Sequence, residues 1–147
     1  MTQEEFIAAI AMPPGQSLRE HDDVLVRVGD ELRALPDEQQ FRILFPLAVK
    51  SQNHGHFPVL DSATLLKRLS PEPAISCEDA VRALLPEWDI SIEQVPFYLA
   101  ARFGPARVFE AVAKLKPEVT EKTQQVNLET VSYWVHVYEG TWPPTKS

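Results

Sequence analysis

The chain has 147 residues, of which 44% are hydrophobic and 24% charged, values typical of a single soluble globular domain. One cysteine excludes an internal disulfide framework, and a net charge of −7 disfavours direct binding to nucleic acid or to anionic membrane. No apolar run approaches the roughly 20 residues that a membrane-spanning helix needs. Residues 1–11 carry two glutamates and no Lys or Arg, so we expect no signal peptide and a cytoplasmic location.

The N-terminal part of the chain predicts two helices. Thr2 and Glu5 match a capping box, in which the hydroxyl accepts a backbone N–H and the carboxylate reaches back to the cap, and the helix that follows ends near Met12. Residues 18–35 carry apolar side chains at helical spacing and predict the second helix. Alternating valines in this segment leave a strand as the alternative: Val24, Val26 and Val28.

Two more helices are predicted before residue 70. Asp37 is expected to start a helix that contains Pro46, which removes one backbone hydrogen bond and kinks the helix. Residues 53–56 are expected to form a loop. Asp61 is then expected to cap a short helix that ends at Leu69.

Residues 76–116 predict three consecutive helices with very short connections. Ser76 and Ser91 each begin a start signal, with an acidic or amide residue three positions later. Gly104–Pro105 predicts a corner before the third helix, because Gly can take the left-handed conformation and Pro suits the first helical position.

The C-terminal part predicts a last helix, which Asn127 is expected to cap and Gly140 to end. Alternating side chains over residues 126–139 again leave a strand as the alternative. Together these patterns predict an all-α, single-domain antiparallel helical array over residues 1–147, with a flexible tail at 141–147. The array is expected to be an irregular bundle or a short α-solenoid of seven or eight helices.

Motifs for catalysis or metal binding are lacking. His54 and His56 flank Gly55 and could offer two imidazoles to one metal, but no third ligand accompanies them, which favours a solvated turn. Cys77 has no adjacent basic partner and is expected to be a half-buried apolar side chain. No Gly-rich phosphate loop and no G-x-S-x-G elbow are present. We therefore expect no enzymatic activity, no cofactor and no metal.

The acidic residues are unevenly distributed. Residues 1–95 hold 16 acidic and 8 basic residues, a net charge of −8, whereas residues 96–147 have a net charge of +1. Two runs hold more acid than helix capping requires, residues 20–38 at −5 and residues 78–93 at −4. Because an acidic surface attracts a basic protein, these runs predict a partner-binding surface. The residues expected in it are Asp22, Asp23, Asp30, Glu31, Glu87, Trp88, Asp89 and Glu93.

Trp88 is the predicted anchor of that surface. It stands between Glu87 and Asp89 in an expected turn, and a tryptophan rimmed by carboxylates is a candidate hot spot for a basic partner. The alternative is that Trp88 packs two helices together and the acids only solvate the surface. Four aromatic residues near the C-terminus are expected to belong to the core, because they recur at helical spacing: Tyr133, Trp134, Tyr138 and Trp142.

In size, acidity, single cysteine and lack of catalytic motifs, the chain resembles the small acidic helical immunity proteins of bacterial interbacterial toxins, including those of the contact-dependent inhibition type. The resemblance is one of general character over the whole chain. It implies a protein-binding inhibitor that neutralises a basic toxin, such as a nuclease, by covering its active or substrate-binding surface. The alternatives are a helical adaptor or scaffold with a different partner and, in third place, a metalloenzyme that uses His54 and His56.

Overall fold

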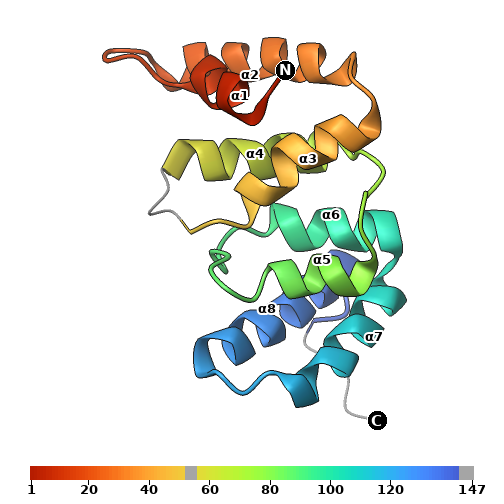
Figure 1. Cartoon of the computed structure of the whole chain (residues 1–147). Coiled ribbons are helices and arrows are strands. Elements are labelled where there is room, and N and C mark those ends of the chain that lie inside the picture. Colours follow the sequence, from red (N-terminus) through yellow and green to blue (C-terminus); the bar gives the residue numbers. More distant parts are fainter. Residues whose placement is uncertain (52–55, 143–147) are drawn as a thin grey trace. The chain divides into compact units, whose positions relative to one another are not determined.

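The computed structural model describes residues 1–51 and 56–142, and the side chains of all of these except His56. In this part of the chain there are eight α-helices, one 3₁₀-helix and no strand (Figure 1). This confirms the predicted all-α helical array. Residues 18–33 and 126–139, for which alternating side chains had left a strand as the alternative, are helical. Residues 53–55 of the predicted loop and residues 143–147 of the predicted tail lie outside the described residues.

The chain groups into two compact units, Met1–Ala74 (unit 1) and Ile75–Ser147 (unit 2). Each unit is described by itself below. The prediction that the whole chain forms one domain stays a prediction.

Unit 1 contains four helices: α1 (Gln3–Ile10), α2 (Leu18–Arg33), α3 (Asp37–Ala48) and α4 (His56–Leu69). Thr2 forms the predicted capping box with Glu5, and the Ser17 hydroxyl accepts the backbone N–H of Glu20 at the start of α2. Each helix then buries one apolar face, as expected for amphipathic helices in a small unit. Fully buried side chains of α1, α2 and α4 include Phe6, Ile10, Val28, Leu32, Leu65 and Leu66.

Gly29 allows α2 to approach α4 closely. A Cβ atom at this position would lie 3.3 Å from Cδ2 of Leu65, which is tighter than an ordinary packing contact. The absence of a side chain at Gly29 therefore sets how closely these two helices pack, although a glycine in a helix costs backbone entropy.

Of the two helix starts predicted at aspartates in unit 1, the one at Asp37 is confirmed and the one at Asp61 is wrong. Asp37 does begin α3, but its carboxylate accepts the backbone N–H of Glu72 at 2.8 Å instead of capping the helix. Asp61 does not cap α4, because that helix begins five residues earlier, at His56. Asp61 is instead buried inside the helix, where it pairs with His21 of α2 at 2.7 Å. Pro46 lies inside α3 as predicted.

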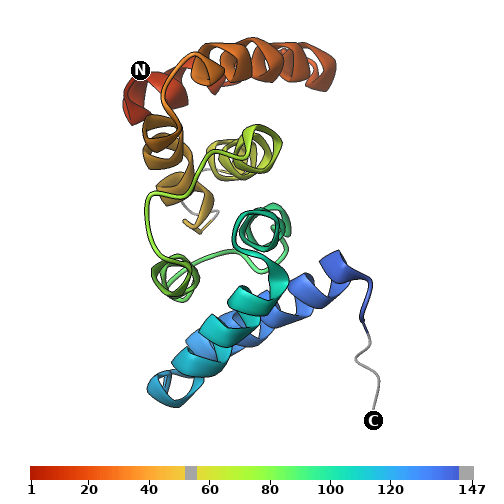
Figure 2. The same ribbon diagram turned by 90° about the vertical axis from the view of Figure 1, so that its right-hand side faces the viewer.

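Unit 2 contains α5 (Cys77–Ala83), α6 (Gln94–Phe103), α7 (Pro105–Leu115), the 3₁₀-helix η2 (Lys116–Glu118) and α8 (Lys122–Glu139). The helices α7 and α8 lie side by side (Figure 2). Ser76 caps α5 as predicted, and Pro105 occupies the first turn of α7. Gly104 has the predicted positive φ, but its ψ of 141° is not the left-handed helical value. Buried side chains of the unit include Val81, Leu84, Val95, Leu99, Val108, Leu115, Val131 and Val135.

The predicted starts of the last helices were wrong because the residues concerned make other contacts. Ser91 does not begin α6, since its backbone N–H and its hydroxyl both bond to the carboxylate of Asp89. Asn127 does not cap α8, which begins at Lys122 with Glu121 as its N-cap. Asn127 is buried in the helix, and its amide donates to the backbone carbonyls of Leu84 and Leu85 at 3.2 and 3.0 Å.

Candidate partner-binding surface

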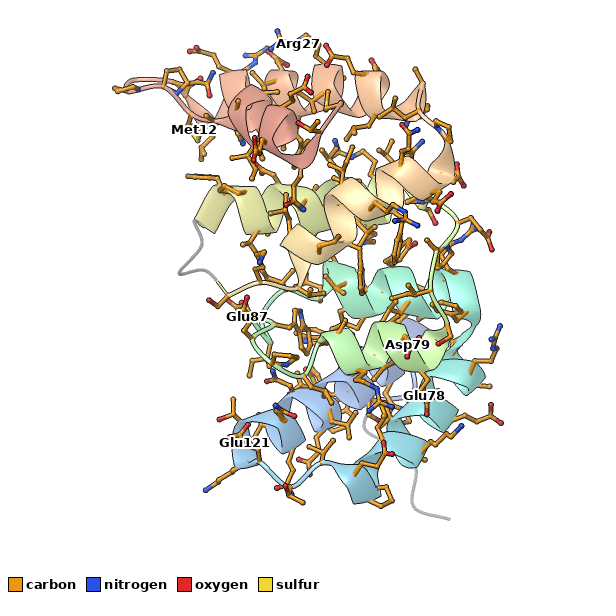
Figure 3. All side chains as sticks on the ribbon, in the orientation of Figure 1. Met12, Arg27, Glu78, Asp79, Glu87 and Glu121 are labelled. Carbon is orange, nitrogen blue, oxygen red and sulfur yellow. The ribbon has the colours of Figure 1, made fainter. Side chains whose placement is uncertain are left out.

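The four predicted acids of unit 1 lie on the exposed face of α2. Asp22, Asp23, Asp30 and Glu31 are all exposed, while the opposite face of the helix is buried. Asp30 pairs with Arg33 at 3.4 Å, and Arg27 points outward from the same helix (Figure 3). Because arginines alternate with the acids, this face is mixed in charge and its attraction for a basic partner is modest.

The other predicted acids lie in the connection between α5 and α6, residues 84–93 of unit 2. Glu87 is exposed at this connection (Figure 3), whereas Asp89 and Glu93 are half-buried. The Asp89 carboxylate is used locally, because it accepts the backbone N–H of Ser91 at 2.9 Å and its hydroxyl at 2.7 Å. Glu93 is the N-cap residue of α6, but its side chain makes no capping bond.

Trp88 is not an exposed anchor. Only 3% of the residue is exposed, and its indole N–H donates to the backbone carbonyl of Ile92 at 3.2 Å. The tryptophan therefore holds the α5–α6 connection together from inside the unit. This corrects the predicted hot spot and agrees with the alternative that Trp88 is a packing residue.

A different tryptophan, Trp134, bonds to the connection between α5 and α6. The indole N–H of Trp134, on α8, donates to the backbone carbonyl of Ile90 at 2.8 Å. The Trp134 ring is half-buried and stands edge-on to Phe97 of α6, with ring centroids 6.0 Å apart. Ile90 itself is 41% exposed. An aromatic side chain therefore does bond to the connection that carries the predicted carboxylates, but it comes from α8.

The C-terminal aromatic residues form a continuous row of ring contacts on the surface of unit 2. Tyr138 contacts Phe97, Trp134 contacts Tyr133, and Tyr133 contacts Trp142, with centroid separations of 4.7–5.7 Å. Tyr138 and Trp142 are 44% and 49% exposed, and the other rings are half-buried. The prediction that these four residues belong to the core is wrong, because smaller residues fill the buried face of α8: Asn127, Leu128, Val131 and Val135.

These residues define an acidic–aromatic surface, made of Ile90, Glu93, Phe97, Trp134 and Tyr138. Aromatic rings supply apolar area and an attractive face for a cation, and carboxylates accept charge-assisted hydrogen bonds from Lys and Arg. The Glu93 carboxylate has no hydrogen-bond or ion-pair partner within the described part of the chain. The surface is therefore suited to a partner that presents basic side chains next to apolar ones.

Two observations concern the candidate catalytic and metal-binding side chains. Unit 1 holds a buried pair, His21 and Asp61, with side chains only 4% and 5% exposed and Phe57 edge-on to the imidazole. Both groups are closed to solvent, and the pair joins α2 to α4. Among residues 1–51 and 56–142 no group of three or more His, Cys, Asp or Glu could hold a metal ion. His54 and the side chain of His56 lie outside the described residues.

Cys77 is more buried than the sequence indicates, with 5% of the residue exposed. Burial raises the pKa of its thiol, Arg107 lowers it in part, and Glu110 raises it further. A thiol with a raised pKa carries less of the reactive thiolate at neutral pH, so Cys77 is not an activated nucleophile.

Comparison with protein-family models, with curated proteins and with solved structures found no match to this chain. No helix within the described residues is long and apolar enough to cross a membrane.

Proposed function

We propose that this protein is an inhibitor of the immunity type, which binds a basic toxin and covers its active or substrate-binding surface. The acidic–aromatic surface of unit 2 makes the central contact. The observation that carries the proposal is the row of partly exposed rings, of which Phe97 lies one helical turn after the unpaired Glu93 at the start of α6. Trp and Tyr are enriched among the residues that dominate binding energy in protein interfaces.

The exposure of these side chains supports a role in contact with another protein. Tyr138, Ile90 and Trp142 are each more than two-fifths exposed and belong to neighbouring parts of one unit. Exposed apolar side chains that occur singly are normal, but a contiguous group marks an interaction site more often than chance. Covering such a group removes apolar area from water and releases about 25 cal/mol for each Å² buried.

The net charge of −7 adds attraction before contact. Coulomb attraction between an acidic and a basic protein speeds their encounter, and it weakens as salt shortens the screening length. The exposed acids of α2, Asp22, Asp23 and Glu31, contribute to this field without being required at the contact itself. The carboxylates would occupy positions on the toxin that accept substrate phosphates, if the toxin is a nuclease.

Affinity capture followed by an activity assay tests the proposal. Immobilised wild-type protein and a Tyr138→Ala variant are exposed to an extract of the source cells, and retained proteins are identified by mass spectrometry. Val126→Ala is the matched control, because Val126 also lies on α8 and is 43% exposed but is not part of the acidic–aromatic surface. The proposal predicts a basic protein that wild type and Val126→Ala retain and Tyr138→Ala loses.

The retained protein, once purified, must also be inhibited. Wild type should abolish its activity at an equimolar ratio, and the control variant should do the same. A partner that binds without loss of activity would favour the adaptor function instead. A gene for the partner immediately next to the gene for this chain would independently favour the immunity function.

A further inference from the structure

A groove runs between α7 and α8 in unit 2, with a volume of about 430 Å³. Small-molecule sites in proteins commonly fall between about 300 and 1,000 Å³. Its lining combines an apolar part, Val112 and Leu128, with four polar side chains: Lys116, Gln125, Glu129 and Ser132. Leu128 is buried and Val112 half-buried, so the apolar part forms the base on which a ligand can rest.

Three of the four polar side chains of the groove, Lys116, Glu129 and Ser132, have no partner in the described part of the protein. Lys116 and Glu129 carry opposite charges, yet they form no ion pair with each other or with any other described residue. The Ser132 hydroxyl likewise makes no hydrogen bond there. Gln125 donates its side-chain N–H to the Val119 carbonyl, which fixes the amide and leaves its oxygen available. The groove thus presents an ammonium, a carboxylate, a hydroxyl and an amide oxygen around an apolar base.

We propose that this groove binds a small zwitterion with an apolar body, of the α-amino acid class. Lys116 pairs with the ligand carboxylate, and Glu129 pairs with the ligand ammonium. The apolar side chain of the ligand rests on Val112 and Leu128, and Ser132 and Gln125 accept or donate the remaining hydrogen bonds. A ligand that carries both charges satisfies two side chains at once, which an ion of one sign cannot do.

The site is independent of the acidic–aromatic surface. Its lining residues lie on the side of α8 that faces α7, whereas Trp134 contacts Ile90 and Phe97 from the connection and from α6. The groove is open to solvent, so ion pairs in it are partly screened and we expect half-saturation on the order of 1 mM. A negative result for this ligand site would therefore not contradict the proposed inhibitor function, and the loss of the inhibitor function would not contradict the ligand site.

An NMR titration of the ¹⁵N-labelled full chain with L-phenylalanine tests the proposal. Two analogues with the same ring and one charge each serve as matched ligands, 3-phenylpropanoate and phenethylamine. The expected result is saturable shifts of the backbone amides of Val112, Gln125, Leu128 and Ser132, with binding of each analogue about fivefold weaker or more. No protein partner is present, so the outcome does not depend on the proposed function.

Variants that each remove one charge provide a second test of the proposed ligand site. Lys116→Met and Glu129→Gln should each weaken binding of L-phenylalanine about fivefold. Lys122→Met and Glu139→Gln are the controls, because both residues are exposed on α8 and neither lines the groove. The proposal is overturned by shifts that do not saturate, by equal binding of the one-charge analogues, or by equal losses in groove and control variants.

Discussion

The indole N–H of Trp134 donates a hydrogen bond to the backbone carbonyl of Ile90 at 2.8 Å, across 44 residues of the chain. This bond joins α8 to the connection between α5 and α6, and it places an aromatic ring at the connection that carries Glu87 and Asp89. The bond therefore contributes both to the packing of unit 2 and to the position of Trp134 in its acidic–aromatic surface.

Trp134→Phe should therefore destabilise the protein while keeping most of the ring. Loss of one hydrogen bond to a neutral carbonyl costs about 0.5–1.5 kcal/mol of unfolding free energy. Trp142→Phe is the matched control, because Trp142 is 49% exposed and its ring contacts do not depend on the indole N–H. Urea denaturation measures both variants, and equal midpoints for the two would contradict a stabilising role for the bond.

Asn127 is the second residue that joins distant elements of unit 2. Asn127→Ala would leave the carbonyls of Leu84 and Leu85, at the end of α5, without their buried donor. We expect a loss of about 1–3 kcal/mol in unfolding free energy. Thr130→Ala is the control, since the Thr130 hydroxyl bonds only to its own helix, at the Val126 carbonyl. If chemical denaturation shows the same loss for both variants, the inter-helix bond is not the cause.

Glu121 gives the stability of α8 a dependence on pH. Backbone hydrogen bonds from Thr123 and then Gln124 lower the pKa of this carboxyl below the ordinary value of 4.5. A carboxyl with a lowered pKa in the folded state stabilises the protein above the unfolded pKa, and this contribution is lost as pH falls through the folded pKa. Glu121 lies at the start of α8 (Figure 3), where a negative charge also suits the helix dipole.

Glu121→Gln should consequently lower the melting temperature at pH 7 and have a smaller effect well below pH 4.5. Thermal unfolding followed by circular dichroism at the two pH values measures the difference. Glu139→Gln serves as the control, because that carboxylate lies at the other end of α8. A deficit for Glu121→Gln that stays constant across the pH range would show that its charge is not involved.

Gly104 forms the corner between α6 and α7, with φ of 90°. A side chain there would meet no atom within 4 Å, so any cost comes from backbone strain and not from a clash. Gly104→Val should destabilise by about 1–3 kcal/mol, the range for residues held at unfavourable backbone angles. An unchanged denaturation midpoint would mean that the corner relaxes to negative φ.

Local sequence signals predicted several helix starts at which the capping residue acts within its own segment, although Ser91 bonds to the nearby Asp89 and does not begin α6. Thr2 and Ser76 cap the helices that follow them, and Gly104–Pro105 separates two helices as expected. The signals failed where a polar residue serves a distant element. Asp61 and Asn127 look like helix caps in the sequence, but each lies inside a helix because it bonds to a group 40 or more residues away.

The candidate surface was predictable only in part, for the same reason. The acidic connection is visible in the sequence, since its carboxylates are neighbours along the chain. The choice between Trp88 and Trp134 as the exposed aromatic residue depends on which ring the packing of α5, α6 and α8 buries. The local sequence does not reveal this, because Trp88 in its turn between two acids looks more exposed than Trp134, which recurs at helical spacing with other aromatic residues.

The most direct measurement of the central claim is the binding kinetics of the purified partner with three variants at low and high salt. Tyr138→Ala should speed dissociation by about thirtyfold, equivalent to about 2 kcal/mol, because it removes an anchor of the acidic–aromatic surface. Glu93→Lys should mainly slow association at low salt, and Val126→Ala should change neither rate. Unchanged rates for both Tyr138→Ala and Glu93→Lys, with the fold intact by circular dichroism, would contradict the claim that this surface binds the partner.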